Sequence, residues 1–172
     1  MTIYDPLRKR EVKLTPEEKV RQWAISWLHN VLEVPMGRMM SEYSFKYNSL
    51  TYRADVMVFD QFAKPIMLVE CKAANVKLDG KVIDQIIRYN LSLKIKFILI
   101  TNGNSTYLCG MNSDGEYHFL NESVKYDLMI NDFSIINSNR YKNVMPKNSV
   151  KIGYVGKKMY VANLRIVISI SE

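Results

Sequence analysis

Cysteine and histidine are scarce in this chain, with two of each among 172 residues. Cys71 and Cys109 are too few to suggest a disulfide framework. No second cysteine or histidine lies at the spacing of a zinc site, so neither cysteine is expected to bind zinc. We expect Cys71, which falls in an apolar run, to be a small buried residue.

Long hydrophobic runs and phosphate-binding loops are also absent. No apolar run approaches the length of a membrane span, and the first residues lack the apolar core of a signal peptide, so we expect a cytoplasmic protein that does not enter a membrane. No repeat, Gly-rich phosphate loop or Walker-type motif appears, which excludes a nucleotide-driven motor within these residues. No zinc finger or recognition helix is evident, so sequence-specific reading of bases is not expected.

The composition is that of a globular domain with an excess of positive charge. Hydrophobic residues make up 48% and charged residues 24%, and the length suits one domain with a sizeable core. The net charge of +7 and the pI near 9.3 favour a polyanionic partner.

Two short apolar runs lie close together and carry charged residues near their ends. The first covers 53–60 and the second 65–72, and both are typical of buried strands. The segment 61–64 between them has the length of a hairpin loop. Asp55 lies near the start of the first run and Glu70 near the end of the second, and these two ends are adjacent in an antiparallel hairpin.

Strand alternation places Glu70 and Lys72 on one face and Cys71 on the other. Two carboxylates and an ammonium group, those of Asp55, Glu70 and Lys72, are therefore expected to converge at one end of an apolar sheet. Buried charge is costly unless it is paired or holds a metal, and two carboxylates suit Mg²⁺. A neighbouring lysine can orient or deprotonate an attacking water and offset the charge that develops on a phosphate.

This arrangement resembles the PD-(D/E)XK nuclease superfamily, whose core motif is an aspartate, a hairpin turn and then Glu-x-Lys. Asp55, Glu70 and Lys72 match the motif, and Ala54 stands where a proline is usual. The resemblance implies a restriction-endonuclease-like core and phosphodiester hydrolysis. It also implies Mg²⁺ or Mn²⁺ held by Asp55 and Glu70, with the backbone carbonyl of Cys71 as a further ligand.

A second block strengthens the resemblance. Residues 81–90 have helical apolar spacing, and 96–101 is another apolar strand, so strand, helix and strand form a crossover unit. Gln85 and Tyr89, four residues apart, project from one face of that helix. The order of these motifs resembles the N-terminal domain of type I restriction enzyme R subunits, which carries a Gln-x-x-x-Tyr motif. That resemblance implies a role near the site for both side chains, whereas packing through their polar tips is the alternative.

The segment after Thr15 is expected to be a helix extending to about Glu33. Thr15 suits the N-cap and Glu18 suits the capping box. Residues 16–22 also match a Pro-Glu-Glu-x-Val-Arg-Gln run that is common in the same family. An acidic residue on the first helix can approach the site in related nucleases, so Glu18 is also a secondary candidate for a metal ligand.

Basic residues near these motifs are candidates for contacting phosphates. Arg53 lies beside the expected site, and Lys77 and Lys81 lie near the start of the Gln85 helix, where cations oppose the helix dipole. Solvated surface cations are the alternative interpretation of all three. With Tyr89, they form the expected nucleic-acid-binding set.

The remaining segments are assigned more coarsely. Residues 1–14 are expected to be a basic flexible leader, with a phosphate-contacting arm as the alternative. The alternation at 43–47 predicts an edge strand, and 107–120 predicts a hairpin with an Asp-Gly turn. The nuclease-like domain is then 15–120, and 121–172 is a C-terminal extension with a short helix or loop and several strands.

We therefore expect an α/β fold with a central mixed sheet of four or five strands flanked by helices. The expected function is that of a metal-dependent DNA endonuclease with low intrinsic sequence specificity, with DNA as the partner. A separate motor or specificity protein would then be needed, and a dimer remains open. One alternative is a non-catalytic nucleic-acid-binding or scaffolding module with the same fold. Another is a purely structural domain whose charges are solvated.

Overall fold

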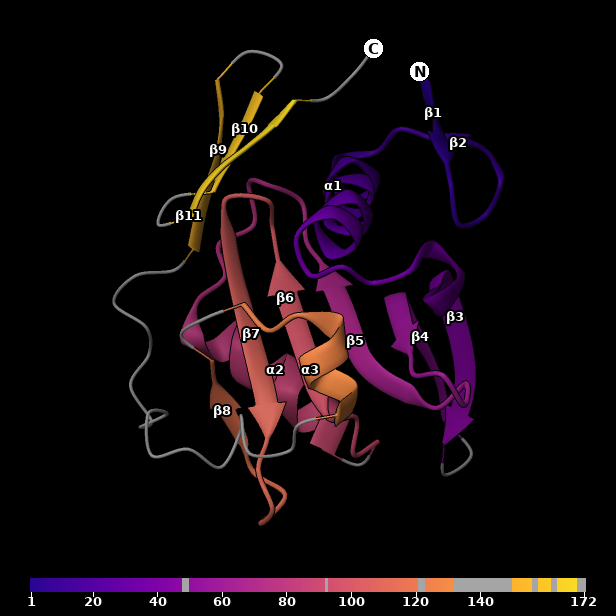
Figure 1. Cartoon of the computed structure of the whole chain (residues 1–172), viewed down its shortest axis with the longest axis vertical. Coiled ribbons are helices and arrows are strands. Elements are labelled where there is room, and N and C mark those ends of the chain that lie inside the picture. Colours follow the sequence, from indigo (N-terminus) through magenta and orange to yellow (C-terminus); the bar gives the residue numbers. More distant parts are fainter. Residues whose placement is uncertain are drawn as a thin grey trace.

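The computed structural model describes residues 1–47, 50–91, 93–120, 123–131, 150–155, 158–161 and 164–169. Within these ranges, nine strands form one sheet: β3 Met39–Tyr47, β4 Leu50–Phe59, β5 Pro65–Cys71, β6 Phe97–Thr101, β7 Ser105–Met111, β8 Tyr117–Phe119, β9 Val150–Val155, β10 Lys158–Val161 and β11 Leu164–Ser169. Their order is β11-β10-β9-β7-β6-β5-β4-β3, and β8 also pairs with β7 (Figure 1). The predicted α/β class with a mixed sheet is confirmed, and the sheet has more strands than the four or five expected.

The hairpin and the crossover unit at the centre of the sheet form as predicted. β4 pairs antiparallel with β5, and β5 pairs parallel with β6. Between β5 and β6 runs α2, Gly80–Leu91, whose first turn is capped by Asp79 because its Oδ1 accepts from the Val82 N–H at 3.1 Å. All five residues of β6 are buried, which explains its unbroken apolar sequence.

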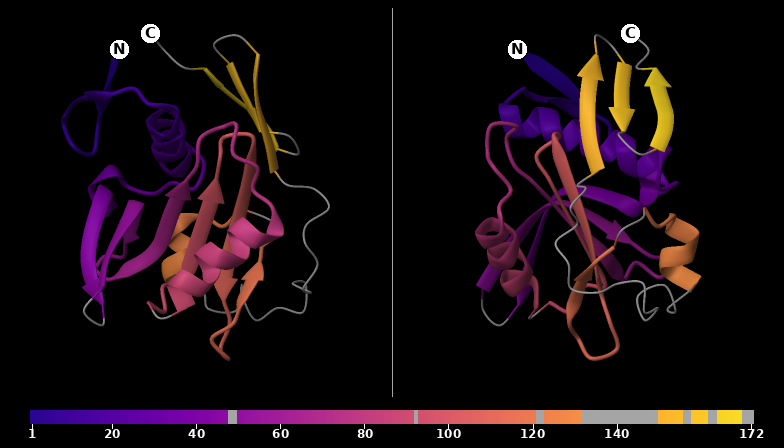
Figure 2. Two further views of the ribbon diagram at one scale, coloured as in Figure 1. Left: turned by 180° about the vertical axis from the view of Figure 1, so that it is seen from behind. Right: turned by 90° about the vertical axis from the view of Figure 1, so that its left-hand side faces the viewer.

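Helices cover both faces of the sheet (Figure 2). On one face, α1 (Pro16–Asn30) and α3 (Tyr126–Asn131) share a core with the β5 residues Val69 and Cys71. On the other face, Ile83 of α2 packs with Leu68 and Ile98. Leu68 and Val69, which are neighbours on β5, therefore belong to opposite cores, as strand alternation requires.

The first helix owes its position to its apolar stripe. Trp23 and Trp27 are 6% and 4% exposed and their rings stack 6.1 Å apart, so these residues, four apart on one face of the helix, belong to the core. Thr15 Oγ1 accepts the Glu18 N–H at 3.1 Å, which confirms the N-cap. The helix ends at Asn30, three residues before the expected end, and Glu33 adopts a left-handed φ of 60°. No described helix has the length and apolar character needed to cross a membrane.

Residues 1–14 form a hairpin, β1 (Thr2–Asp5) and β2 (Arg10–Lys13), instead of the expected flexible leader. Asp5 is fully buried and its Oδ1 accepts the backbone N–H groups of Leu7 and Arg8, which shapes the turn. The Arg8 guanidinium then pairs with both Asp5 and Glu18. The charged residues of this segment suggest a solvated leader, but in the structure they pair with one another. The hairpin was therefore not evident from the sequence.

The sequence predicted the strands at one edge of the sheet in more detail than those at the other edge. β3 is the edge strand that the alternation at 43–47 predicted, and the hairpin of β7 and β8 also forms. Residues 48 and 49, between β3 and β4, lie outside the described residues. In the C-terminal extension α3 is the expected short helix, and β9 joins β7 through the pairs Ser105–Lys151 and Thr106–Val150.

Candidate active site

The candidate site is located at the end of β5, beside the part of β4 that extends beyond that end. β5 stops at Cys71, whereas β4 extends back to Leu50, so Asp55 lies in the middle of its strand and not at the start as expected. Val56 and Val69 are paired across the two strands; Asp55 comes one residue before Val56, and Glu70 comes one residue after Val69. The Cys71 N–H donates to Asp55 Oδ2 at 2.6 Å, which fixes the aspartate against the end of β5.

Arg21 of α1 joins three carboxylates at this point. Its Nη2 lies 2.6 Å from Asp55 Oδ1, and its Nη1 lies 2.5 Å from Glu18 Oε2 and 2.7 Å from Glu42 Oε1. Arg21 is only 6% exposed. Burial alone would lower the pKa of its guanidinium, but the hydrogen bond and charge of Asp55, followed by the charges of Glu18 and Glu42, raise that pKa overall. A permanent positive charge therefore lies against Asp55.

The ion pairs extend from Arg21 in two directions. Glu18, the secondary candidate for a metal ligand, also accepts Arg8 Nη2 at 2.7 Å and Gln22 Nε2 at 2.8 Å through its Oε1. Glu42 accepts Arg53 Nη1 at 2.9 Å and has a left-handed φ of 54° on β3. The acidic residue of the first helix thus approaches Asp55, and Arg21 stands between them.

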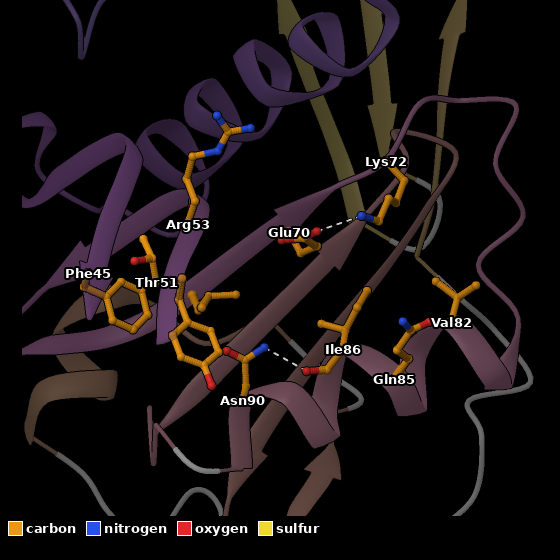
Figure 3. Close-up of a pocket in the computed structure, with 11 residues that line it drawn as sticks. Phe45, Thr51, Arg53, Glu70, Lys72, Val82, Gln85, Ile86 and Asn90 are labelled. Carbon is orange, nitrogen blue, oxygen red and sulfur yellow. Dashed lines mark hydrogen bonds and ion pairs between the residues drawn. The ribbon is translucent and has the colours of Figure 1, made fainter. Parts of the chain in front are cut away.

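Glu70 and Lys72 lie on one face of the sheet, as strand alternation predicted, and the structure shows that this is the α2 side. Lys72 Nζ lies 2.7 Å from Glu70 Oε1 (Figure 3). The Lys72 backbone N–H donates to the Thr101 carbonyl at 2.8 Å. Both side chains line a pocket of about 340 Å³. Its other lining residues are Phe45, Thr51, Tyr52, Arg53, Leu68, Val82, Gln85, Ile86 and Asn90.

The protonation of this pair follows from its surroundings. Burial and then the negative charge of Asp55 raise the pKa of Glu70, although Lys72 partly opposes the shift. Burial lowers the pKa of Lys72, but the hydrogen bond and charge of Glu70 outweigh it and raise that pKa overall. Lys72 is therefore an ammonium ion at neutral pH, suited to donate hydrogen bonds and to offset negative charge.

The remaining predicted residues separate into three groups. Gln85 and Arg53 line the same pocket as Glu70, as expected for residues near the site. Lys77 and Lys81 are exposed near the start of α2 and are not among the residues that line this pocket. The side chain of Tyr89 lies outside the described part of the structure.

Arg21 and Glu42 were not identified as site residues from the sequence. The spacing of Glu18 and Arg21, three residues apart on a helix, predicts that these two side chains pair. No local signal connects Arg21 to Asp55, which is 34 residues away. Glu42 reaches the guanidinium from a strand position with positive φ, a conformation that its residue type does not predict.

Asp55 and Glu70 supply two carboxylates, the donor type that a hard divalent cation takes. The negative charge of Asp55 raises the pKa of Glu70, and a cation bound to both carboxylates would relieve this repulsion. The Cys71 backbone carbonyl follows directly after Glu70. Each oxygen of Asp55 already accepts one N–H, and a carboxylate oxygen can accept a second partner. The described residues contain no group of three or more acidic, histidine or cysteine side chains placed to hold a metal.

The chain belongs to the family described as type I restriction enzyme R protein N terminus (HSDR_N), whose model matches residues 16–123. A similar solved structure is that of a "putative nuclease belonging to DUF820" from Anabaena variabilis. It shares 12% identity with a TM-score of 0.40, covering 70% of this chain and 76% of the other. No curated protein matches the chain.

The Arg21 geometry makes a stability prediction. Substituting Arg21→Ala leaves three carboxylates without their shared cation, which should lower the free energy of unfolding at neutral pH by about 3–5 kcal/mol. Arg53→Ala is the matched control, because among the described residues this arginine forms its ion pair with Glu42 alone and its side chain is 65% exposed, so it should cost less than about 1 kcal/mol. Urea denaturation measures both. Equal losses would show that Arg21 does not organise the site.

Proposed function

We propose that this chain is a metal-dependent nuclease domain that hydrolyses phosphodiester bonds in DNA with low intrinsic sequence specificity. The observation that carries the proposal is the pairing of Glu70 and Lys72 in one pocket, beside the Asp55 carboxylate that raises the pKa of Glu70. A half-buried carboxylate beside another one is unfavourable for stability alone, and its position next to a lysine suits phosphate chemistry. Membership in the restriction enzyme R family supports the same activity.

Each residue would have a defined role. Asp55, Glu70 and the Cys71 carbonyl would hold Mg²⁺ or Mn²⁺, which when bound supplies Lewis acidity and lowers the pKa of water. Lys72, as an ammonium ion, would orient the attacking water and stabilise the charge that develops on the phosphate. Gln85, from the facing wall of the pocket, would position the same water or a phosphate oxygen by a hydrogen bond.

The metal site makes the first functional prediction. Isothermal titration of Mn²⁺ or Mg²⁺ should show binding to the wild type and none to Asp55→Ala. Asp60→Ala is the matched control, since Asp60 lies after the far end of β4 and is not among the residues that line the Glu70 pocket. Because the pKa of Glu70 is raised above its ordinary value of 4.5, protons should compete with the metal and affinity should increase as pH rises through that pKa. Equal heats for wild type and Asp55→Ala would remove this site from consideration.

The second functional prediction concerns the chemical step. Lys72→Ala should lower the rate of DNA cleavage by a factor of about 10² or more while metal and DNA binding stay near wild type. Lys72→Arg should also fail, because arginine presents a planar fork of donors in place of a compact ammonium group.

Lys64→Ala provides the control for Lys72, since Lys64 is an exposed lysine of the β4–β5 turn. Its cleavage rate should equal that of the wild type in a time course on plasmid DNA. Unchanged rates in both Lys72 variants would identify Lys72 as a structural partner of Glu70 only.

One observation favours a second function, that of a non-catalytic nucleic-acid-binding module. Arg21 donates to Asp55 Oδ1 at 2.6 Å and supplies a cation where the proposed metal would compete. In that case the wild type would bind DNA without cleaving it at any metal concentration. The same cleavage assay separates the two functions.

The positive charge of the chain makes a prediction about substrate choice. Binding to unrelated DNA duplexes should be similar and should weaken at least tenfold between about 50 and 200 mM salt, as expected for two or more phosphate contacts. Lys81→Ala should reduce the slope of log affinity against log salt by about 1, whereas Lys64→Ala should not. A strong preference for one short sequence, or affinity that ignores salt, would contradict this prediction.

A further inference from the structure

The pocket that holds Glu70 and Lys72 has an aromatic wall that the proposed hydrolysis does not require. Phe45 of β3 and Tyr52 of β4 are direct cross-strand partners. Their rings stack with centroids 5.6 Å apart and an interplanar angle of 16°, and both line the pocket. An aromatic surface therefore lies in the same cavity as the charged pair.

The facing wall is apolar and comes from α2. Val82 and Ile86 line the pocket opposite the β3–β4 residues, as Figure 3 shows. In the left view of Figure 2, α2 lies in front of the middle of the sheet, whereas β3 and β4 lie beside it. The pocket is thus bounded by an aromatic side, an apolar side and the Glu70–Lys72 pair. Its volume of about 340 Å³ falls within the size range of small-ligand sites.

Asn90 of α2 adds a buried polar group to this cavity. It is 5% exposed, and its Nδ2 donates one hydrogen bond to the Ile86 carbonyl at 2.8 Å. Thr51 and Gln85 line the same pocket, so hydrogen-bond donors and acceptors are present together.

We propose that this pocket binds one unpaired nucleobase, with the adjoining phosphate directed toward Lys72 and Arg53. An aromatic wall stacks on any base because every base has a π face, and the amides of Asn90 and Gln85 match its polar edge. A base inside a duplex cannot enter, since its faces and its pairing edge are already in contact with other bases. The substrate class is therefore DNA that carries unpaired nucleotides: single strands, bulges or displaced strands.

This inference rests on the proposed function for the position of the phosphate and deepens it by naming the substrate class. The competing explanation of Phe45 and Tyr52 is structural, because cross-strand aromatic pairs stabilise sheet edges. Tyr107 provides a matched control, since it lies on β7 in the same core as Phe45, contacts Phe119 edge-on and is not among the lining residues. Leucine in place of Tyr52 or Tyr107 removes the ring and keeps an apolar side chain.

The experiment measures binding by the full chain without divalent metal, so that no probe is cut. Three DNA probes of one sequence are compared by fluorescence anisotropy: a duplex, the same duplex with one unpaired nucleotide, and that bulged duplex with an abasic site in place of the unpaired base. We expect the unpaired base to improve affinity about tenfold over both other probes. Tyr52→Leu should abolish this preference, and Tyr107→Leu should keep it.

Each outcome decides the question. Equal affinity for the base and the abasic site, or an equal loss in Tyr107→Leu, would overturn the nucleobase pocket. A Tyr52-dependent preference without cleavage in Mg²⁺ would retain the pocket and refute the proposed catalysis. Cleavage with no such preference would retain the catalysis and refute the pocket. Absence of binding to all three probes at low salt would refute both.

Discussion

The ion pairing of one buried guanidinium organises the candidate site. Arg21 contacts Glu18 of its own helix, Glu42 of β3 and Asp55 of β4, so a single side chain connects the first helix to two strands. Each of these carboxylates would be costly to hold near the sheet without a partner. Arg8 and Arg53 then extend the pairing to the N-terminal hairpin and to the mouth of the pocket.

Asp55 connects the two faces of the sheet. Its Oδ1 faces the α1 side and Arg21, its Oδ2 accepts the backbone N–H of Cys71, and its charge still reaches Glu70 on the α2 side. A change in charge on either face therefore acts on the other through this one carboxylate. In this arrangement a cation that bound Asp55 would compete with Arg21 and would also ease the ionisation of Glu70.

Much of the fold could be predicted from local patterns, because those patterns report burial. The apolar runs that became β5 and β6, the helical spacing of α2 and the Trp23–Trp27 stripe each describe a face that must be covered. Strand alternation also placed Glu70 and Lys72 on one face correctly. The β1–β2 hairpin was not predicted, since its stability depends on pairing Asp5 and Arg8 with each other and with α1.

The sequence by itself determined the fold class, the hairpin with its Glu-x-Lys end and the crossover that follows, because period-two and helical patterns depend on residues close together in the chain. Only the tertiary structure decided that Arg21 pairs with Asp55 and Glu42, and that Phe45 and Tyr52 face α2 across the pocket. These contacts join elements that are far apart in the chain. Which side chains meet depends on the twist of the sheet and on the extension of β4 beyond β5. No local sequence pattern predicts these contacts, because the same residues would also be compatible with a solvated strand end.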